Sequence, residues 1–282
     1  MRFALTVLLW LATTVAVAVA VPGVWIQLHV VDADGYVALA RSAAGDPAVQ
    51  SAMASELTTR AMALIAARGG GRYAVDGAQV HEAAAAFTAG PEFPPLFARV
   101  NQAAHGWLFD PPGRDGGQWA VDVAPMLRNG AIAALLSRHN VTVPATLTVP
   151  ITESMPRSLR QGQLSRLTTW GPGAAFGAAA LGICCAVLTL AAARRRGKAL
   201  SALGISALLV GALGYGGIEM GRQHLNEALN RTTGPVRDIA DALVVRAESG
   251  LHQWLNLTLL AGAALAGLGV LVAITGALLK KG

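Results

Sequence analysis

The amino-acid sequence predicts a mainly α membrane protein with four transmembrane helices, a largely helical extracytoplasmic domain with minor β pairing, and an outer helical hairpin. Of the 282 residues, 54% are hydrophobic and only 13% are charged. A soluble domain carries about 25% charged residues. Four stretches without acidic or basic side chains are long enough to cross the roughly 30 Å of a bilayer core. The net positive charge, finally, comes from three short segments beside these stretches.

The four apolar stretches are rich in Leu, Val and Ala and contain the Gly content typical of membrane helices. A cleaved signal peptide is the alternative for the first stretch, because Ala18-Val19-Ala20 has the small-x-small pattern of a cleavage site. The apolar region, however, continues to Leu28 and exceeds the usual length of about 7–15 residues. We therefore expect a retained membrane anchor.

The distribution of charge predicts the orientation of the chain. The segments that contain Arg2, the "ARRRGKA" loop around Lys198, and the C-terminal Lys280 and Lys281 carry a formal charge of +7 and no acidic residue. Residues 22–170 are neutral overall, and residues 219–254 carry −1. Cytoplasmic loops of membrane proteins accumulate Lys and Arg. The sequence therefore predicts that both termini are cytoplasmic, and the basic pI near 10.0 does not indicate nucleic-acid binding.

These observations divide the chain into eight segments. They are a transmembrane helix at 1–28, an extracytoplasmic domain at 29–170, a transmembrane helix at 171–193, a cytoplasmic loop at 194–198, a transmembrane helix at 199–218, an extracytoplasmic helical hairpin at 219–254, a transmembrane helix at 255–279, and a cytoplasmic tail at 280–282.

Apolar periodicity and capping residues predict the elements of the extracytoplasmic domain. Asp34 and Asp46 are the expected N-caps of the first two helices. The outer hairpin has an apolar stripe, which we expect to be buried against this domain or against a partner protein. Expected helices cover 34–42, 47–68, 79–88, 93–109, 125–138 and 157–169. The expected strand pairing joins 119–123 to 146–151.

No constellation of residues predicts catalysis, so we expect a protein that is not an enzyme and has no cofactor. The "DADG" sequence at Asp32 begins like a calcium-binding loop, but Tyr36, Val37 and Ala43 occupy positions that would need an oxygen ligand, Gly and Glu. The six histidines lack the spacing of a zinc site. Ionisable residues within the spans, which coupled transporters usually need, are also lacking.

Two sets of residues are candidates for binding. The first is a group of small residues at four-residue spacing, which lets helices approach closely; internal packing and docking against another membrane protein are both possible roles. Its members are Gly173, Gly177, Gly217, Gly221, Gly262 and Ala266. The second set is aromatic and could line an apolar cavity, although packing in the domain core is the simpler interpretation. Its members are Phe87, Phe93, Phe97, Trp107 and Trp119.

The order of several motifs is also informative. The first reads "D-x-D-x-YV" with a following "DPAVQ", here Asp32 to Val37 and Asp46 to Gln50. It precedes an "F…N-x-x-AH" helix from Phe97 to His105 and a "V-D-x-A-P" junction from Val121 to Pro125. In this order the chain resembles an uncharacterised family of actinobacterial four-span integral membrane proteins. It departs from that family at Ser42-Ala43, where the family often has "APLA". The resemblance implies the topology and fold and a location in a bacterial plasma membrane, but it carries no catalytic residue over.

Taken together, these features predict a non-catalytic accessory, assembly or stabilising subunit of a larger membrane complex. Its expected surroundings are the lipid bilayer and other membrane proteins of a transport or envelope complex, without nucleic acid. Small multi-pass partners of mammalian-cell-entry lipid importers are similar in layout, which is an analogy of architecture alone. The alternative is a protein that binds or senses a lipid or small molecule in an apolar cavity of the outer domain.

Overall fold

The structure is a computed structural model that describes residues 2–69, 76–111, 120–150, 161–193, 195–229 and 234–278. The chain forms two compact units. One, here called the span unit, comprises residues 1–30, 167–224 and 248–282. The other, here called the helical domain, comprises residues 31–166 and 225–247.

Four long helices supply the span unit. They are α1 (Arg2–Ile26), α8 (Ser165–Ala192), α9 (Arg196–Leu229) and α10 (Pro235–Leu278). Within the described ranges, four helical stretches are long and apolar enough to cross a membrane: Ala4–Val31, Ser165–Ala192, Arg196–Glu227 and Arg237–Gly276. The length and composition of these helices thus confirm the prediction of a multi-pass membrane protein. Helices α8, α9 and α10 extend beyond their predicted spans because helical hydrogen bonding continues past the apolar residues, as it does in α9 after Ile218.

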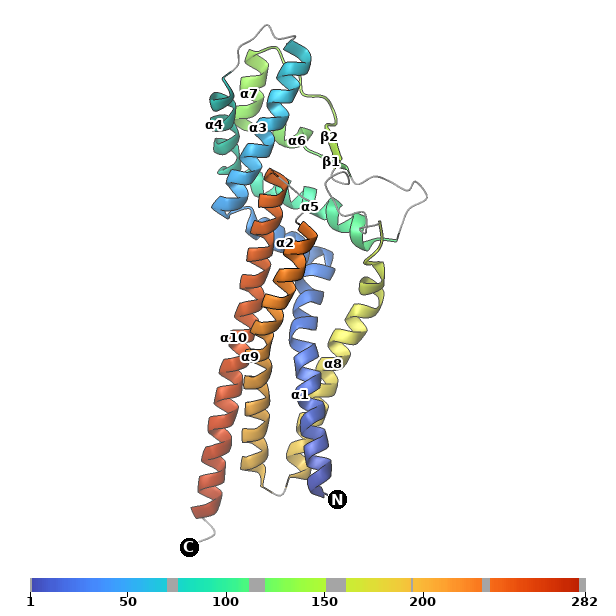
Figure 1. The fold of residues 1–282 in the computed structure, drawn as a ribbon, viewed down its shortest axis with the longest axis vertical. Coiled ribbons are helices and arrows are strands. Elements are labelled where there is room, and N and C mark those ends of the chain that lie inside the picture. The colour runs from blue at the N-terminus through green and yellow to red at the C-terminus, as the bar shows by residue number, and fades with distance from the viewer. Residues whose placement is uncertain are drawn as a thin grey trace. The chain divides into compact units, whose positions relative to one another are not determined.

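The helices of the span unit run side by side in alternating directions (Figure 1). The first residues of α1, the turn between α8 and α9 and the last residues of α10 consequently lie at one end of this unit. Packing between named residues agrees, because Trp10 of α1 lies beside Ala202 of α9 and Gly197 of α9 lies beside Ala273 of α10. Arg2 and the described basic residues Arg195, Arg196 and Lys198 therefore lie at the same end of the unit.

A π-helical turn, η1 (Gln27–Val31), ends the first helix. Its His29 ring stacks on Trp25, with ring centroids 5.1 Å apart, and meets the edge of Trp254 at 6.1 Å. Trp25 in turn is 4% exposed and lies against Gly250. Tyr215 and His252 form a second stacked pair, and the Tyr215 hydroxyl donates to Asn256 Oδ1 at 2.6 Å. Trp and Tyr are enriched where a spanning helix enters the polar interface.

The helical domain contains α2 (Ala33–Ala43), α3 (Pro47–Gly69), α4 (Gly77–Thr88), α5 (Phe93–Phe109), α6 (Ala124–Leu127) and α7 (Gly130–Arg138). Helix α3 packs against α4, α4 packs against α7, and α2 packs against α5. Their apolar faces meet in one core, whose fully buried members include Val49, Leu57, Val80, Phe93 and Leu127.

Aspartates begin three of these helices. Asp46 Oδ1 accepts from the Ala48 amide, as the Asp46-Pro47 sequence predicts. Asp76 accepts from the Ala78 amide. The expectation that Asp34 caps the first helix is wrong, because Asp32 is the N-cap and its carboxylate accepts from the Gly35 amide at 2.9 Å. Asp34 lies within the first turn, where a negative charge still favours the positive end of the helix dipole.

Two short strands, β1 (Ala120–Asp122) and β2 (Thr148–Pro150), pair antiparallel with Val121 opposite Val149. Both lie within the two ranges that the sequence analysis paired. Asp122 Oδ1 accepts from the Ala124 amide at 2.9 Å and from the Leu147 amide at 2.8 Å, so one carboxylate fixes both the strand end and the start of α6.

The prediction of a single helix from Pro125 to Arg138 is wrong, because the helix is interrupted between the end of α6 at Leu127 and the start of α7 at Gly130. Gly130 has φ +63° at this break, a conformation that glycine adopts without steric cost. Of the helix expected at 157–169, residues 157–160 lie outside the described ranges, and α8 begins at Ser165.

The expected hairpin arm at the start of α10 belongs to the helical domain. Its Ala242 is buried in the core, and Ile239 and Leu243 pack against that core. Arg246 Nη2 also donates to the Ser42 hydroxyl of α2 at 2.6 Å. Ile239 and Leu243 of the expected apolar stripe therefore pack against the domain core, which is one of the two alternatives considered for the stripe.

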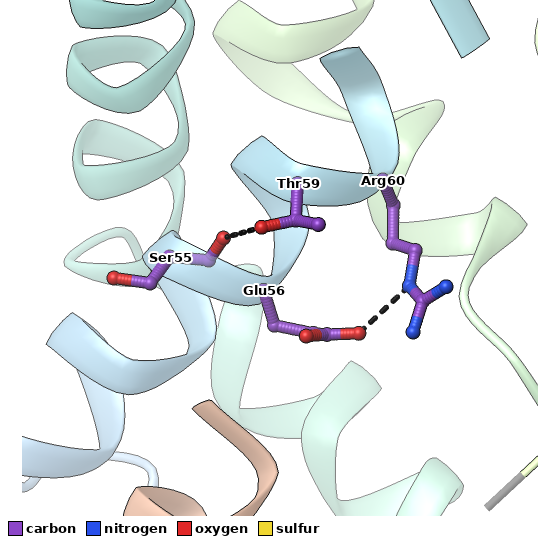
Figure 2. A network of polar contacts seen from close by, with 4 residues as sticks. All are labelled: Ser55, Glu56, Thr59 and Arg60. Carbon is purple, nitrogen blue, oxygen red and sulfur yellow. Dashed lines mark hydrogen bonds and ion pairs between the residues drawn. The ribbon is translucent and has the colours of Figure 1, made fainter. Parts of the chain in front are cut away.

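One buried charge in the domain is compensated locally (Figure 2). Glu56 on α3 is 8% exposed, and its Oε1 accepts from Arg60 Nε one turn later at 2.7 Å. Thr59, beside this pair, donates its hydroxyl to the Ser55 carbonyl at 3.0 Å. A buried carboxylate is costly unless it is paired, and the Arg60 guanidinium, whose side chain is 35% exposed, meets that need.

Candidate functional site: the small-residue faces of the spanning helices

Helices α9 and α10 pack along a line of small residues, here called the glycine seam. Its glycines recur every seven residues: Gly197, Gly204 and Gly211 on α9, and Gly262 and Gly269 on α10. A seven-residue repeat keeps one line of a helix against its partner. Small residues on that line let the two backbones approach closely.

The distances across the seam leave no room for a Cβ atom at its glycine positions. A Cβ atom added to Gly197 would lie 2.7 Å from the backbone nitrogen of Ala273, and one added to Gly262 would lie 2.9 Å from the carbonyl oxygen of Gly204. At Gly211 the opposing atoms belong to the Leu259 side chain, at 2.6 Å. The candidate residues Gly262 and Ala266 therefore pack inside the span unit, which is the internal role considered for them.

Helix α1 is joined to α9 by polar side chains. Trp10 Nε1 donates to the Ala202 carbonyl at 3.0 Å. Thr14 Oγ1 donates to Ser206 Oγ at 2.8 Å, and Ser206, which is 2% exposed, donates to the same Ala202 carbonyl. Hydrogen bonds of this kind hold membrane helices together, because an unpaired hydroxyl in hydrocarbon is costly.

Helix α8 packs on α1 through other small residues. A Cβ on Gly182 would lie 3.4 Å from the Ala16 Cβ, and a Cβ on Gly23 would lie 3.6 Å from the Ala175 Cβ. Near the end of α1, the buried Gln27 places its Oε1 against Gly171. All four helices thus use Gly or Ala where they contact a neighbour, and α1 adds hydrogen bonds.

The remaining candidate glycines differ sharply from those of the seam. Gly173 and Gly177 on α8 are exposed, and a Cβ on either would meet no atom within 4 Å. The same holds for Gly217 and Gly221 on α9. We call these two pairs the open glycine pairs. Internal packing of the described residues does not account for their spacing.

Residues of the "D-x-D-x-YV" and "F…N-x-x-AH" patterns meet in the helical domain. The Tyr36 hydroxyl of α2 donates to Asn101 Oδ1 of α5 at 3.4 Å, and the Tyr36 ring lies 5.1 Å from the His105 ring. His105 Nε2 lies 3.0 Å from the Val31 carbonyl oxygen and donates to it, since a carbonyl can only accept. Burial raises the pKa of the Tyr36 hydroxyl above its ordinary value. This cluster joins α5 to the start of α2.

The aromatic candidates mostly lie in the domain core. Phe87, Phe93 and Phe97 are at most 5% exposed, and their rings contact one another at centroid distances of 6.0 and 5.4 Å. They therefore pack against each other. Trp107 instead lines an open groove of about 590 Å³ together with Arg99, whereas Trp119 lies outside the described residues.

Sequence reasoning missed several of these features. Four-residue spacing indicates Gly262 but not Gly197, Gly204 or Gly269, which share a seven-residue interval instead. It also missed the contact of Thr14 with Ser206, because residues 192 positions apart reveal their proximity only in the folded chain.

Comparison of the chain with protein-family models, with curated proteins and with solved structures gave no match.

Proposed function

We propose that the chain is a non-catalytic multi-pass protein of the bacterial plasma membrane that acts as an accessory, assembly or stabilising subunit of a larger membrane complex. A transport or envelope complex is the expected setting, and a mammalian-cell-entry-type lipid importer is the candidate by analogy of layout. In this proposal the helical domain is extracytoplasmic and both termini are cytoplasmic.

The observation that carries the proposal is the contrast between the glycine seam and the open glycine pairs. Glycine destabilises a helix by about 1 kcal/mol relative to alanine, so its presence needs a reason. In the seam the reason is the close approach of α9 and α10. At Gly173 and Gly177 no neighbour within the described chain supplies one, and a helix from another membrane protein would do so.

The proposed orientation follows from charge. Arg195, Arg196 and Lys198 are exposed and lie beside the turn between α8 and α9, and no acidic residue lies in the first turn of α9. Cytoplasmic segments retain such residues. A reporter fused near Arg99, active only outside the cytoplasm, should therefore be active. A cytosolic signal at that position would overturn the orientation, as would a mature chain that starts at Val21.

Purification of the complex in mild detergent tests docking. The variant Gly173→Leu/Gly177→Leu should fold normally, because the added side chains meet open space. It should nevertheless lose stoichiometric co-purification of a membrane transporter that accompanies the wild-type chain. Gly276→Leu is the matched control, since Gly276 on α10 also has no atom within 4 Å of an added Cβ.

The outcomes separate the two functions considered. Normal complex recovery and expression of the Gly173→Leu/Gly177→Leu variant would show that the α8 face does not dock a partner. Recovery of the wild-type chain alone, with a defined lipid bound, would contradict the accessory role and support a lipid-binding protein.

A further inference from the structure

The span unit has a second feature that the accessory role does not explain. A groove of about 420 Å³ lies between α9 and α10 near the basic end of these helices. Its lining residues are Lys198, Ser201, Ala202, Ile205, Val270, Ala273 and Ile274. The groove is separate from the open glycine pairs, so its occupant is independent of the docking proposal.

The shape of the groove follows from the residues around it. The glycine seam brings α9 and α10 together, and the small side chains of Ala202 and Ala273 line the groove beside it. Larger side chains line it as well: Ile205, Val270 and Ile274 are 49%, 50% and 52% exposed. The Ser201 hydroxyl donates to the Ala266 carbonyl at 3.3 Å, so it already has a partner. Apart from Lys198 and Ser201, the residues that line the groove have hydrocarbon side chains.

One end of the groove is positively charged. Lys198 is exposed and lines the groove, and Arg195 and Arg196 are exposed nearby in sequence. No carboxylate among the described residues forms an ion pair with Lys198. From Lys198 to Ile205 α9 rises about 10 Å, at about 1.5 Å per residue. The groove therefore combines an apolar surface about 10 Å long with the Lys198 ammonium at one end.

We propose that this groove binds one anionic phospholipid, with an acyl chain along Ile205 and Val270 and the phosphate beside Lys198. The charge complementarity selects the occupant: a helix of a partner protein would fill the apolar part without neutralising Lys198, whereas a phospholipid satisfies both parts. Clustered Lys and Arg at a membrane surface attract anionic lipids, and the apolar channel next to Lys198 fixes one lipid in place.

Native mass spectrometry of the full-length chain tests the proposal. The chain is titrated with dioleoyl phosphatidylglycerol and, separately, with dioleoyl phosphatidylcholine, which has the same acyl chains without net charge. We expect one saturable phosphatidylglycerol per chain and clearly weaker binding of phosphatidylcholine. Lys198→Gln should weaken phosphatidylglycerol binding about fivefold, the loss that corresponds to one cation near an anionic lipid surface.

Arg2→Gln is the matched control, because it removes one positive charge from the start of α1 without altering a groove residue. It should leave the affinity nearly unchanged. Val270→Trp narrows the apolar part of the groove and should also weaken phosphatidylglycerol binding, although Lys198 is retained. Lys198 and Val270 are both exposed, so these variants are expected to fold.

Three results would overturn the proposal. Equal affinity for the two lipids would remove the role of charge, and equal losses in Lys198→Gln and Arg2→Gln would show a diffuse electrostatic effect. Displacement of phosphatidylglycerol by inorganic phosphate or glycerol phosphate at comparable concentration would identify an anion site without a lipid chain.

Discussion

Gly204 on α9 faces Ala266 on α10 so closely that a Cβ on Gly204 would lie 2.8 Å from the Ala266 Cα. Atoms of real side chains do not approach a backbone at that distance, so only glycine fits there while the helices keep this separation. The same argument holds one heptad away at Gly197, whose added Cβ would lie 2.9 Å from the Ala273 Cα. The seam is thus a steric requirement repeated along the helix pair.

The first prediction concerns Gly204→Ala. The added methyl group must push α9 and α10 apart, and overpacking of this kind typically costs about 1–3 kcal/mol. We expect the unfolding midpoint of the chain in detergent to fall accordingly, as followed by circular dichroism. Gly217→Ala is the control, because its added methyl meets no atom within 4 Å. A similar loss of stability in both variants would contradict the steric role of the seam.

The second prediction concerns the bond between Thr14 and Ser206. Thr14→Val and Ser206→Ala each remove one partner of a 2.8 Å hydrogen bond between α1 and α9. A double-mutant cycle measured by unfolding in detergent should give a coupling energy of about 0.6 kcal/mol, the average for such bonds in membranes. Thr275→Val is a control, because among the described residues the Thr275 hydroxyl bonds only carbonyls of its own helix. Additive losses would show that the bond between Thr14 and Ser206 does not help to hold α1 against α9.

The spans and the domain helices could be predicted from the sequence because each depends on local patterns. Apolar length located all four spanning stretches, and the Asp46-Pro47 pair located the start of α3. The break between α6 and α7 was also visible in principle, since Asn129-Gly130 is a turn dipeptide. It was overlooked because the apolar pattern continues across it.

Features that depend on two distant segments could not be predicted in this way. The contact of Tyr36 with Asn101 joins residues 65 positions apart, and the glycine seam requires the register of α9 against α10. Two aspartates in "DADG" are also equivalent by pattern, so only the backbone conformation of Asp32, with φ −70° and ψ 128°, identifies the N-cap. The sequence pattern therefore identifies candidate residues, and the folded structure shows which of them make the contact or cap the helix.

The third prediction tests this selection between the two aspartates. Asp32→Ala removes the side chain that accepts from the Gly35 amide and should cost about 1 kcal/mol, as for other N-cap residues. Asp34→Ala removes only a charge in the first turn, worth about 0.3–1 kcal/mol at low ionic strength. Thermal unfolding in 0.5 M salt should therefore separate them, because salt screens the charge and leaves the cap. Equal losses at high salt would contradict the assignment of Asp32 as the cap.

The last prediction concerns the stability of the helical domain at alkaline pH. Burial raises the pKa of Tyr36 above the ordinary value of about 10, because a tyrosinate that packs against α5 loses hydration. As the pH rises through 10, Tyr36 in the unfolded chain loses its proton before Tyr36 in the folded chain does. The folded state then holds more protons, so the free energy of unfolding falls with rising pH until the folded group also ionises.

Tyr36→Phe isolates this effect from the other groups that titrate near pH 10. The variant loses a long hydrogen bond to Asn101, at 3.4 Å, so its stability at pH 7 should fall by no more than about 1 kcal/mol. Between pH 9 and 11 its stability should decline less steeply than that of the wild-type chain, as measured by chemical unfolding at each pH. Parallel declines would mean that Tyr36 ionises equally in both states, and the packing of its ring against His105 would then not exclude water from the hydroxyl.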